Sequence, residues 1–421
     1  MEPILLGELV YYAWQRSDFY RELWKRKGFN PEKNFQGDCD LKNIPILSKD
    51  DLLSVSTKKR SIMESKDCYY FTALSSGTTR YPLLSLQPRF AMPPYYRFVQ
   101  NLVKGSSSVL VLRPGSHAIA LIAGALPERY FPPGSIIALG DVNDFVFSAR
   151  LAHEIEADWL VARPSDVIRF AATLEQQGYA PSRIKFLHIT GEPLTSAAIS
   201  LIRRLYPEAS AAYIYAMTEG PAAMGLKSSR CAALDTISPT AYHLNTRDFI
   251  FEAMGGSSVV TALHKIPTPL IRYNTRDRIL IKDNFQCSCG FPPSAIGIIG
   301  SRVGEESYKI GGCTFRVEEI KNALRKLAGL VTDDFRLQIE QVADGDRLLN
   351  LLHFTIRLVG DPTPFIIGTI KEIFEREIYV TQSRSLGEAI RQGFIAPLGI
   401  EHDASLSGAS ILPPDEIMKP F

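Results

Sequence analysis

The side chains best suited to phosphate chemistry are concentrated in one short run of the sequence. Residues 74–82 place hydroxyl side chains on both sides of Gly77, followed by Arg80, with the hydroxyls supplied by Ser75, Ser76, Thr78 and Thr79. Backbone N–H groups and hydroxyls in such a loop can surround polyphosphate oxygens, and a guanidinium adds charge-assisted hydrogen bonds. The run is not a Walker A loop, because the Gly-Lys-Ser/Thr ending is missing. Taken alone, it fits a polar surface turn equally well.

Two more loops combine a glycine with acidic or hydroxyl side chains. The sequence Gly191-Glu192-Pro193 comes soon after an apolar run at 186–189, and Thr218-Glu219-Gly220 follows another at 212–215. Both could be ordinary loops, since glycine and proline are the commonest loop residues. Both loops directly follow apolar runs, so their relative placement depends on the secondary structure of those runs.

Those elements alternate in type along the middle of the chain. Apolar runs predict strands at Val109–Leu112, Ile136–Leu139, Trp159–Ala162, Phe186–Ile189 and Ala212–Tyr215. Helical periodicity predicts helices at Asp144–Ile155, Ser165–Gln177 and Ser196–Tyr206, with Ser165 and Ser196 as N-caps of the last two. This alternation predicts an α/β fold with mainly parallel strands flanked by helices. Ligands bind beyond the carboxyl ends of strands in such sheets.

The two ends of the chain have other patterns. The first forty residues have helical periodicity, with an aromatic stripe that is typical of a core. Residues 257–281 alternate as antiparallel strands, and a mixture of helical and strand patterns follows residue 303. The pattern predicts a large N-terminal domain at 1–302 and a small α+β C-terminal domain at 303–421, joined near Gly300 and Gly304.

Composition excludes several classes of protein. The chain has 421 residues and a net charge of +2, without a polycationic block, so dedicated binding of nucleic acid is not expected. The longest apolar stretch, Ala118 to Leu126, is far shorter than the roughly 20 residues that cross a bilayer, and no membrane association is expected. An acidic residue near the start is unlike a secretory signal, and six scattered cysteines suit a reducing compartment. We expect a cytoplasmic protein.

Taken in order, the motifs resemble those of the adenylate-forming enzymes, in particular the phenylacetate–CoA ligase-like branch of the acyl-CoA and aryl-CoA synthetases. The resemblance covers about residues 10–330. It includes the hydroxyl-rich loop, the Gly-Glu-Pro loop, Tyr215–Glu219, Ile271–Asp277 and Gly300–Gly312, and an N-terminal segment containing Ser48-Lys49-Asp50-Asp51-Leu52. It implies an ATP-dependent, AMP-forming acid–thiol ligase. Such an enzyme converts a carboxylic acid into acyl-AMP and pyrophosphate, then transfers the acyl group to a thiol.

The resemblance also implies a role for each motif residue. The ATP phosphates would be held by the loop around Gly77, through Ser75, Ser76, Thr78 and Thr79. Thr218 would donate to the α-phosphate and Glu219 would hold Mg²⁺. Asp277 would accept the ribose hydroxyls, and Arg302 would contact the ribose. The adenine would be lined by Gly191, Glu192 and Pro193. Tyr215 would lie against the nucleotide or the acyl group.

Several of these residues have structural alternatives. Arg272 and Asp277 could form a structural ion pair. Glu219 could be an acidic residue at a helix N-terminus, and Tyr215 could be packing at a strand end.

A second site is implied by cysteine and histidine spacing. Cys287 and Cys289 lie one residue apart and can ligate one zinc ion. In the family branch an upstream cysteine and a histidine often complete the set, and Cys231 and His243 stand about where the resemblance would place them. Four such ligands would close a structural zinc site. The alternative is a pair of ordinary reduced cysteines and a surface histidine.

The chain departs from the family pattern near its end. Relatives carry a catalytic lysine on a C-terminal loop, whereas Lys419 is the only basic residue after Ser405. This leaves the second step open between coenzyme A and an acyl carrier protein as acceptor. An aryl acid is expected as substrate from the branch alone, and a homodimer is a further expectation. The alternative is a degenerate member that binds an adenylate, or serves as an acyl-transfer partner, without efficient adenylation.

Overall fold

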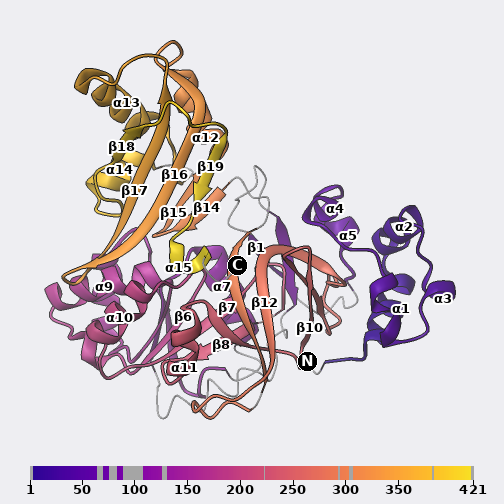
Figure 1. Ribbon diagram of the computed structural model, residues 1–421. Coiled ribbons are helices and arrows are strands. Elements are labelled where there is room, and N and C mark those ends of the chain that lie inside the picture. The colour runs from indigo at the N-terminus through magenta and orange to yellow at the C-terminus, as the bar shows by residue number, and fades with distance from the viewer. Residues whose placement is uncertain are drawn as a thin grey trace.

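The computed structural model describes residues 3–63, 70–74, 83–88, 108–125, 130–221, 223–292, 294–302, 307–381 and 384–418. Figure 1 shows a large lower body that contains the long sheet, and a smaller upper body in orange and yellow. In the described part of the chain, the large sheet has eleven strands in the order β10-β11-β12-β13-β9-β8-β7-β6-β5-β3-β4. A separate four-stranded sheet, in the order β18-β17-β16-β19, forms the smaller body. The predicted fold class is therefore confirmed.

The chain begins with short helices that cover the side of the large body. Trp24 and Tyr20 are completely buried there, and the rings of Trp14 and Trp24 stack at 6.4 Å, so the aromatic stripe is core as predicted. Ser17 caps the second helix by accepting a hydrogen bond from the backbone N–H of Tyr20. The helices are α1 (Leu6–Arg16), α2 (Asp18–Arg26), α3 (Pro31–Asn34), the 3-10 helix η1 (Asp38–Asn43), α4 (Lys49–Leu53) and α5 (Thr57–Arg60).

Half of the large sheet is parallel and contains all five predicted strands. These are β3 (Ser108–Val111), β4 (Ile136–Leu139), β5 (Trp159–Ala162), β6 (Phe186–Thr190) and β7 (Ser210–Ala216). The connecting helices are α7 (Gly115–Ala125), α8 (Phe145–Glu154), α9 (Pro164–Gln176), η3 (Pro181–Arg183) and α10 (Ser196–Leu205). β3 and β5 are fully buried, as expected for strands covered by helices on both faces.

The two predicted N-caps are wrong by one or two residues. Thr195 caps α10 by accepting from the backbone N–H of Ala198, and α9 begins at Pro164, directly after Arg163. Proline suits the first position of a helix, because its missing N–H would have had no partner there. Ser165 is therefore inside α9, and its hydroxyl is available for another contact.

The other half of the large sheet is antiparallel, which makes the sheet mixed. Its strands are β8 (Ala223–Ser228), β9 (Ala241–Leu244), β10 (Phe249–Met254), β11 (Ser257–Ala262), β12 (Tyr273–Phe285) and β13 (Ser294–Arg302), with the short helix α11 (Ala232–Ile237) between β8 and β9. In the register of β12 and β13, Asp277 lies opposite Arg302. A further two-stranded hairpin pairs β1 (Tyr70–Leu74) with β2 (Leu84–Pro88).

The C-terminal body has its own core, which is consistent with a separate small domain. Its strands are β14 (Ser307–Ile310), β15 (Cys313–Arg316), β16 (Val331–Asp344), β17 (Arg347–Leu358), β18 (Gly399–His402) and β19 (Ala409–Leu412). Its helices are α12 (Val317–Arg325), α13 (Pro364–Glu377), α14 (Leu386–Arg391) and α15 (Asp415–Met418). The boundary at 302/303 stays a prediction. Gly300 lies within β13, but Gly304 of the expected hinge falls outside the described residues.

The small body rests on helices α9 and α10 of the large one, as Figure 1 shows. Thr195 donates a hydrogen bond to the side chain of Gln341 at 2.6 Å, and the backbone N–H of Ser196 donates to Glu416 at 3.0 Å. The guanidinium of Arg169 lies 3.5 Å from the ring centroid of Phe394. Among the described helices, none has the length and apolar character needed to cross a membrane.

Candidate functional site

The predicted nucleotide-binding residues within the described part of the chain line one cavity. The cavity has a volume of about 370 Å³ and lies at the carboxyl ends of β6 and β7, where strands β12 to β14 also contribute to its wall. Its lining includes Gly191, Glu192, Pro193, Tyr215, Thr218, Glu219, Asp277 and Arg302. The phosphate-loop residues Ser75, Ser76, Gly77, Thr78 and Thr79, and the candidate lysine Lys419, lie outside the described residues.

Asp277 is held by partners on two different strands. One carboxylate oxygen accepts from Arg302 Nε at 2.9 Å, and the other accepts from the Tyr215 hydroxyl at 2.6 Å. Burial and the neighbouring Asp277 charge raise the pKa of Tyr215, so its hydroxyl remains a donor. Tyr215 also packs against Tyr242, with ring centroids 5.9 Å apart. The tyrosine therefore both packs and positions the aspartate.

The alternative ion pair between Arg272 and Asp277 is wrong. Arg272 instead makes a two-pronged contact with Glu252, at 2.9 and 3.0 Å, and donates to the backbone carbonyl oxygens of Lys42 and Ile44. Arg272 thus ties the N-terminal segment to the large sheet. This leaves Asp277 and Arg302 as a separate pair on the cavity wall.

Glu219 and Thr218 lie in a turn after β7. A described helix does not begin at this turn, so the alternative explanation of Glu219 as a helix N-terminal acid is wrong. The Tyr273 hydroxyl donates to one Glu219 oxygen over a long 3.4 Å. Glu219 lines the cavity, and its carboxylate oxygens are the kind of ligand that Mg²⁺ prefers.

Glu192 is positioned by both bodies of the protein. Its carboxylate accepts from the Ser165 hydroxyl at 2.7 Å and from the backbone N–H of Gly312 at 2.9 Å, and it lies 3.7 Å from Arg163. Burial acts to raise the pKa of Glu192, but the charges of Arg163 and Lys309 and these hydrogen bonds outweigh it and lower the pKa. Because Gly312 follows β14, the predicted adenine loop is joined directly to the C-terminal body.

The cavity carries more positive than negative side chains. Its charged lining residues are the carboxylates Glu192, Glu219 and Asp277, and the cations Lys49, Arg113, Arg276, Arg302 and Lys309. Sequence reasoning missed Arg113 and Lys309. Arg113 directly follows the strand predicted at 109–112, so the rule that selected the other loops could have selected it. Lys309 offered no comparable signal.

We expect Asp277→Asn to weaken nucleotide binding. The amide keeps the shape of the side chain but offers one acceptor oxygen instead of two, and it removes the negative charge that Arg302 contacts. Affinity for AMP or ATP, measured by calorimetry, should fall by roughly 10- to 100-fold, the loss expected for one or two charge-assisted hydrogen bonds. The matched control Asp346→Asn changes an exposed carboxylate and should bind nucleotide as the unmodified protein does.

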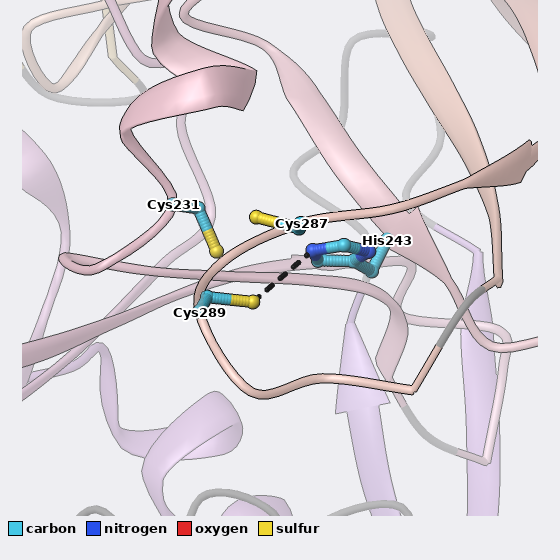
Figure 2. A group of neighbouring side chains, drawn as sticks. All are labelled: Cys231, His243, Cys287 and Cys289. Atoms are coloured by element: carbon cyan, nitrogen blue, oxygen red, sulfur yellow. Dashed lines mark hydrogen bonds between the residues drawn. The ribbon is translucent and has the colours of Figure 1, made fainter.

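The predicted zinc ligands also come together. In Figure 2 the side chains of Cys231, His243, Cys287 and Cys289 point toward one another. Their four ligand atoms lie within 4.8 Å of one another, although the residues come from separate segments of the chain. Three thiols and one imidazole form a donor set that tetrahedral structural zinc takes.

Neighbouring groups orient three of these side chains, those of Cys231, His243 and Cys289, for ligation. His243 Nδ1 is bonded to the Ser294 hydroxyl at 3.1 Å, which turns Nε2 toward Cys289 Sγ at 3.5 Å. The backbone N–H groups of Ser228 and Phe291 donate to Cys231 Sγ and Cys289 Sγ, at 3.3 and 3.4 Å. Such outer contacts fix the tautomer and stabilise thiolates. The residues present therefore fit a zinc ion.

No family model matches the sequence, and no curated protein matches it. Solved structures do match its fold. A crystal structure of 2-hydroxyisobutyryl-CoA ligase with 2-HIB-AMP and CoA in the thioesterification state has a TM-score of 0.63 and 18% sequence identity, covering 97% of this chain and 88% of that chain. The same ligase in the postadenylation state with 2-HIB-AMP has a TM-score of 0.59 and 18% identity, covering 99% of this chain and 89% of that chain.

At this identity the likeness establishes the fold. This chain shares the fold of that ligase: a large mixed sheet flanked by helices, with a smaller C-terminal body that has its own sheet.

Proposed function

We propose that the protein activates a carboxylic acid with ATP, releasing pyrophosphate, and transfers the acyl group to the thiol of coenzyme A. The observation that carries the proposal is the convergence of Thr218, Glu219, Asp277 and Arg302 on one cavity. The fold it shares with a CoA ligase solved with an acyl-AMP and CoA supports the same reaction class. Fold alone does not assign an activity, whereas the residues of a site determine which chemistry it can support.

The first step requires positive groups or hydrogen-bond donors that stabilise negative charge on the α-phosphoryl oxygens. A substrate carboxylate oxygen attacks the α-phosphorus, the bond to the pyrophosphate oxygen breaks, and negative charge accumulates on the phosphoryl oxygens. In the proposed site Thr218 would donate a hydrogen bond to the α-phosphate, and Glu219 would hold Mg²⁺. The metal, when bound, supplies positive charge to those oxygens. Asp277, positioned by Tyr215 and Arg302, accepts hydrogen bonds from the ribose hydroxyls.

In the second step the thiol sulfur attacks the acyl carbon, and AMP leaves. The acceptor in this proposal is coenzyme A, and an acyl carrier protein is the alternative. The acid is proposed to be aryl, in keeping with the phenylacetate–CoA ligase-like branch. Thr78 and the other hydroxyl residues of its loop are proposed to hold the phosphates during the first step, and Lys419 is the candidate catalytic lysine.

We further propose that Cys231, His243, Cys287 and Cys289 hold one structural zinc ion. The site joins α11, β9 and the loop between β12 and β13, and it lies against a small apolar cluster. Its contribution would be to fix this end of the large sheet, since closing such a site adds binding free energy to folding.

A screen of acids tests the activity. Purified protein is incubated with Mg²⁺, ATP and aryl, hydroxy or fatty acids, and pyrophosphate release is measured with and without coenzyme A. The proposal expects acid-dependent release and a CoA thioester detected by mass spectrometry. Calorimetric binding of ATP without release for any acid would instead support the degenerate, adenylate-binding alternative. Absence of both binding and release would contradict the proposed site.

A further inference from the structure

Arg113 and the Asp277–Arg302 pair line the same cavity from different parts of the large sheet. Arg113 follows β3, which the sheet order separates from β12 and β13 by several strands. Its Nη1 donates to the backbone carbonyl of Thr190 at 2.7 Å, and the guanidinium packs over Gly191. A Cβ at Gly191, where φ is +93°, would lie 2.5 Å from Nη1. A side chain at position 191 would therefore collide with the guanidinium in its present position.

This guanidinium has no carboxylate partner within 4.0 Å in the described part of the chain. The two acidic residues that act on it electrostatically, Asp166 and Glu192, are engaged by Arg163 at 2.5 and 3.7 Å. Burial and the charge of Arg163 lower the pKa of Arg113 to about 10, so it stays charged at neutral pH. The side chain is half-buried, so holding its charge there without a counter-ion has a cost, and a bound anion would reduce that cost.

Among the neighbouring cavity groups, the Glu192 carboxylate is engaged by Arg163, and the two histidines carry no negative charge. Burial and the charge of Arg113 lower the pKa of His117 to about 4 and that of His188 to about 3, so both rings are neutral. His188 Nδ1 is bonded to the Tyr130 hydroxyl at 2.7 Å. Lys309, on β14, lines the same cavity. Burial and the charges of Arg163 and Arg113 lower the pKa of Lys309 to about 8, although the charge of Glu192 acts to raise it. This part of the wall is therefore cationic.

We propose that Arg113 binds a second, permanently anionic group on the acyl substrate, so that the acid is an aryl or short-chain dicarboxylic acid. This inference rests on the proposed function. The carboxylate that is activated loses its charge when it becomes an acyl phosphate, whereas a second carboxylate keeps its charge through both steps. A fixed guanidinium suits the second group, because its planar donors match a carboxylate in two-pronged geometry.

Matched pairs of acids test the proposal. Terephthalate is compared with benzoate, 4-carboxyphenylacetate with phenylacetate, and glutarate with butyrate, by kcat/KM for pyrophosphate release. The unmodified protein should prefer the dicarboxylate within at least one pair. In Arg113→Met that preference should fall by about 100-fold, the scale of losing one partner of a buried charge pair, and Arg113→Lys should restore part of it. Arg150→Met, on an exposed side chain, is the matched control and should keep the preference.

A binding measurement separates this inference from the proposed function. Calorimetry with the same acids, without ATP, should detect dicarboxylate binding that Arg113→Met abolishes, even if no acid is turned over. Release of pyrophosphate with monocarboxylic acids only, and with a preference that Arg113→Met does not change, would overturn the inference while leaving the function intact. An equal rise in KM for ATP with every acid, at unchanged acid preference, would assign Arg113 to the nucleotide phosphates and also overturn it.

Discussion

Glu219→Gln should lower the rate of acyl-AMP formation by about 10²- to 10³-fold, the range found when one electrostatic contact to a developing oxyanion is removed. The amide is nearly the same size, so the turn after β7 should keep its path. It lacks the negative charge that holds a divalent cation against the phosphates. The measurement is pyrophosphate release at saturating acid, with Mg²⁺ varied at each ATP concentration. Loss of activity should be accompanied by a higher Mg²⁺ requirement.

Two control variants define this prediction. Glu208→Gln changes an exposed carboxylate away from the cavity and should be neutral. Tyr273→Phe removes the long hydrogen bond to Glu219 but leaves its charge, so its effect should be much smaller than that of Glu219→Gln. An unchanged rate and unchanged Mg²⁺ dependence in Glu219→Gln would remove Glu219 from the proposed mechanism.

The zinc site carries the second large effect. Protein purified without added zinc should contain about one equivalent, bound by the four residues of Figure 2. Cys289→Ser replaces a thiolate ligand with a hydroxyl and should lower the free energy of unfolding by on the order of 4 kcal/mol, because loss of a structural metal is among the most destabilising single changes. Metal content is measured by plasma mass spectrometry, and stability by denaturant unfolding.

The matched control is Cys39→Ser, since Cys39 is exposed and lies outside the cluster. It should keep both the metal and the stability. If Cys289→Ser does not fold, treatment of the unmodified protein with a mercurial reagent should still release zinc to a chromogenic chelator. A stable, metal-free unmodified protein would refute the site.

The central half of the fold was predictable from sequence because its strands are short, mainly apolar and separated by amphipathic helices. β3 and β5 bury every residue, which makes periodicity a sufficient signal there. The N-caps were less predictable, since Ser165 and Ser196 each have a neighbour that can begin the helix as well or better. Whether Thr195 or Ser196 is the N-cap depends on which of the two residues has extended backbone angles. Hydrophobic periodicity does not specify those angles.

The site residues that belong to a sequence motif could be predicted. The contacts between site residues could not be predicted where they depend on the register of neighbouring strands. Asp277 could be selected from its motif, but its partner could not. The register of β12 against β13 sets Asp277 opposite Arg302, while Arg272, with a positive φ of 49°, turns toward Glu252. The guanidinium of Arg113 fits in its place because Gly191 has no side chain. The two residues lie far apart in the sequence, so this contact could not be predicted.

The hydrogen bond from the Gly312 backbone to Glu192 has a thermodynamic consequence under the proposed function. The loop expected to contact adenine is also the loop on which the C-terminal body docks. A nucleotide that binds one docking state better than the other must shift the balance between those states. The same coupling free energy then acts in both directions, so any change that weakens docking alters nucleotide affinity by the factor with which nucleotide alters docking. Substrate occupancy and domain position would be linked variables in this protein.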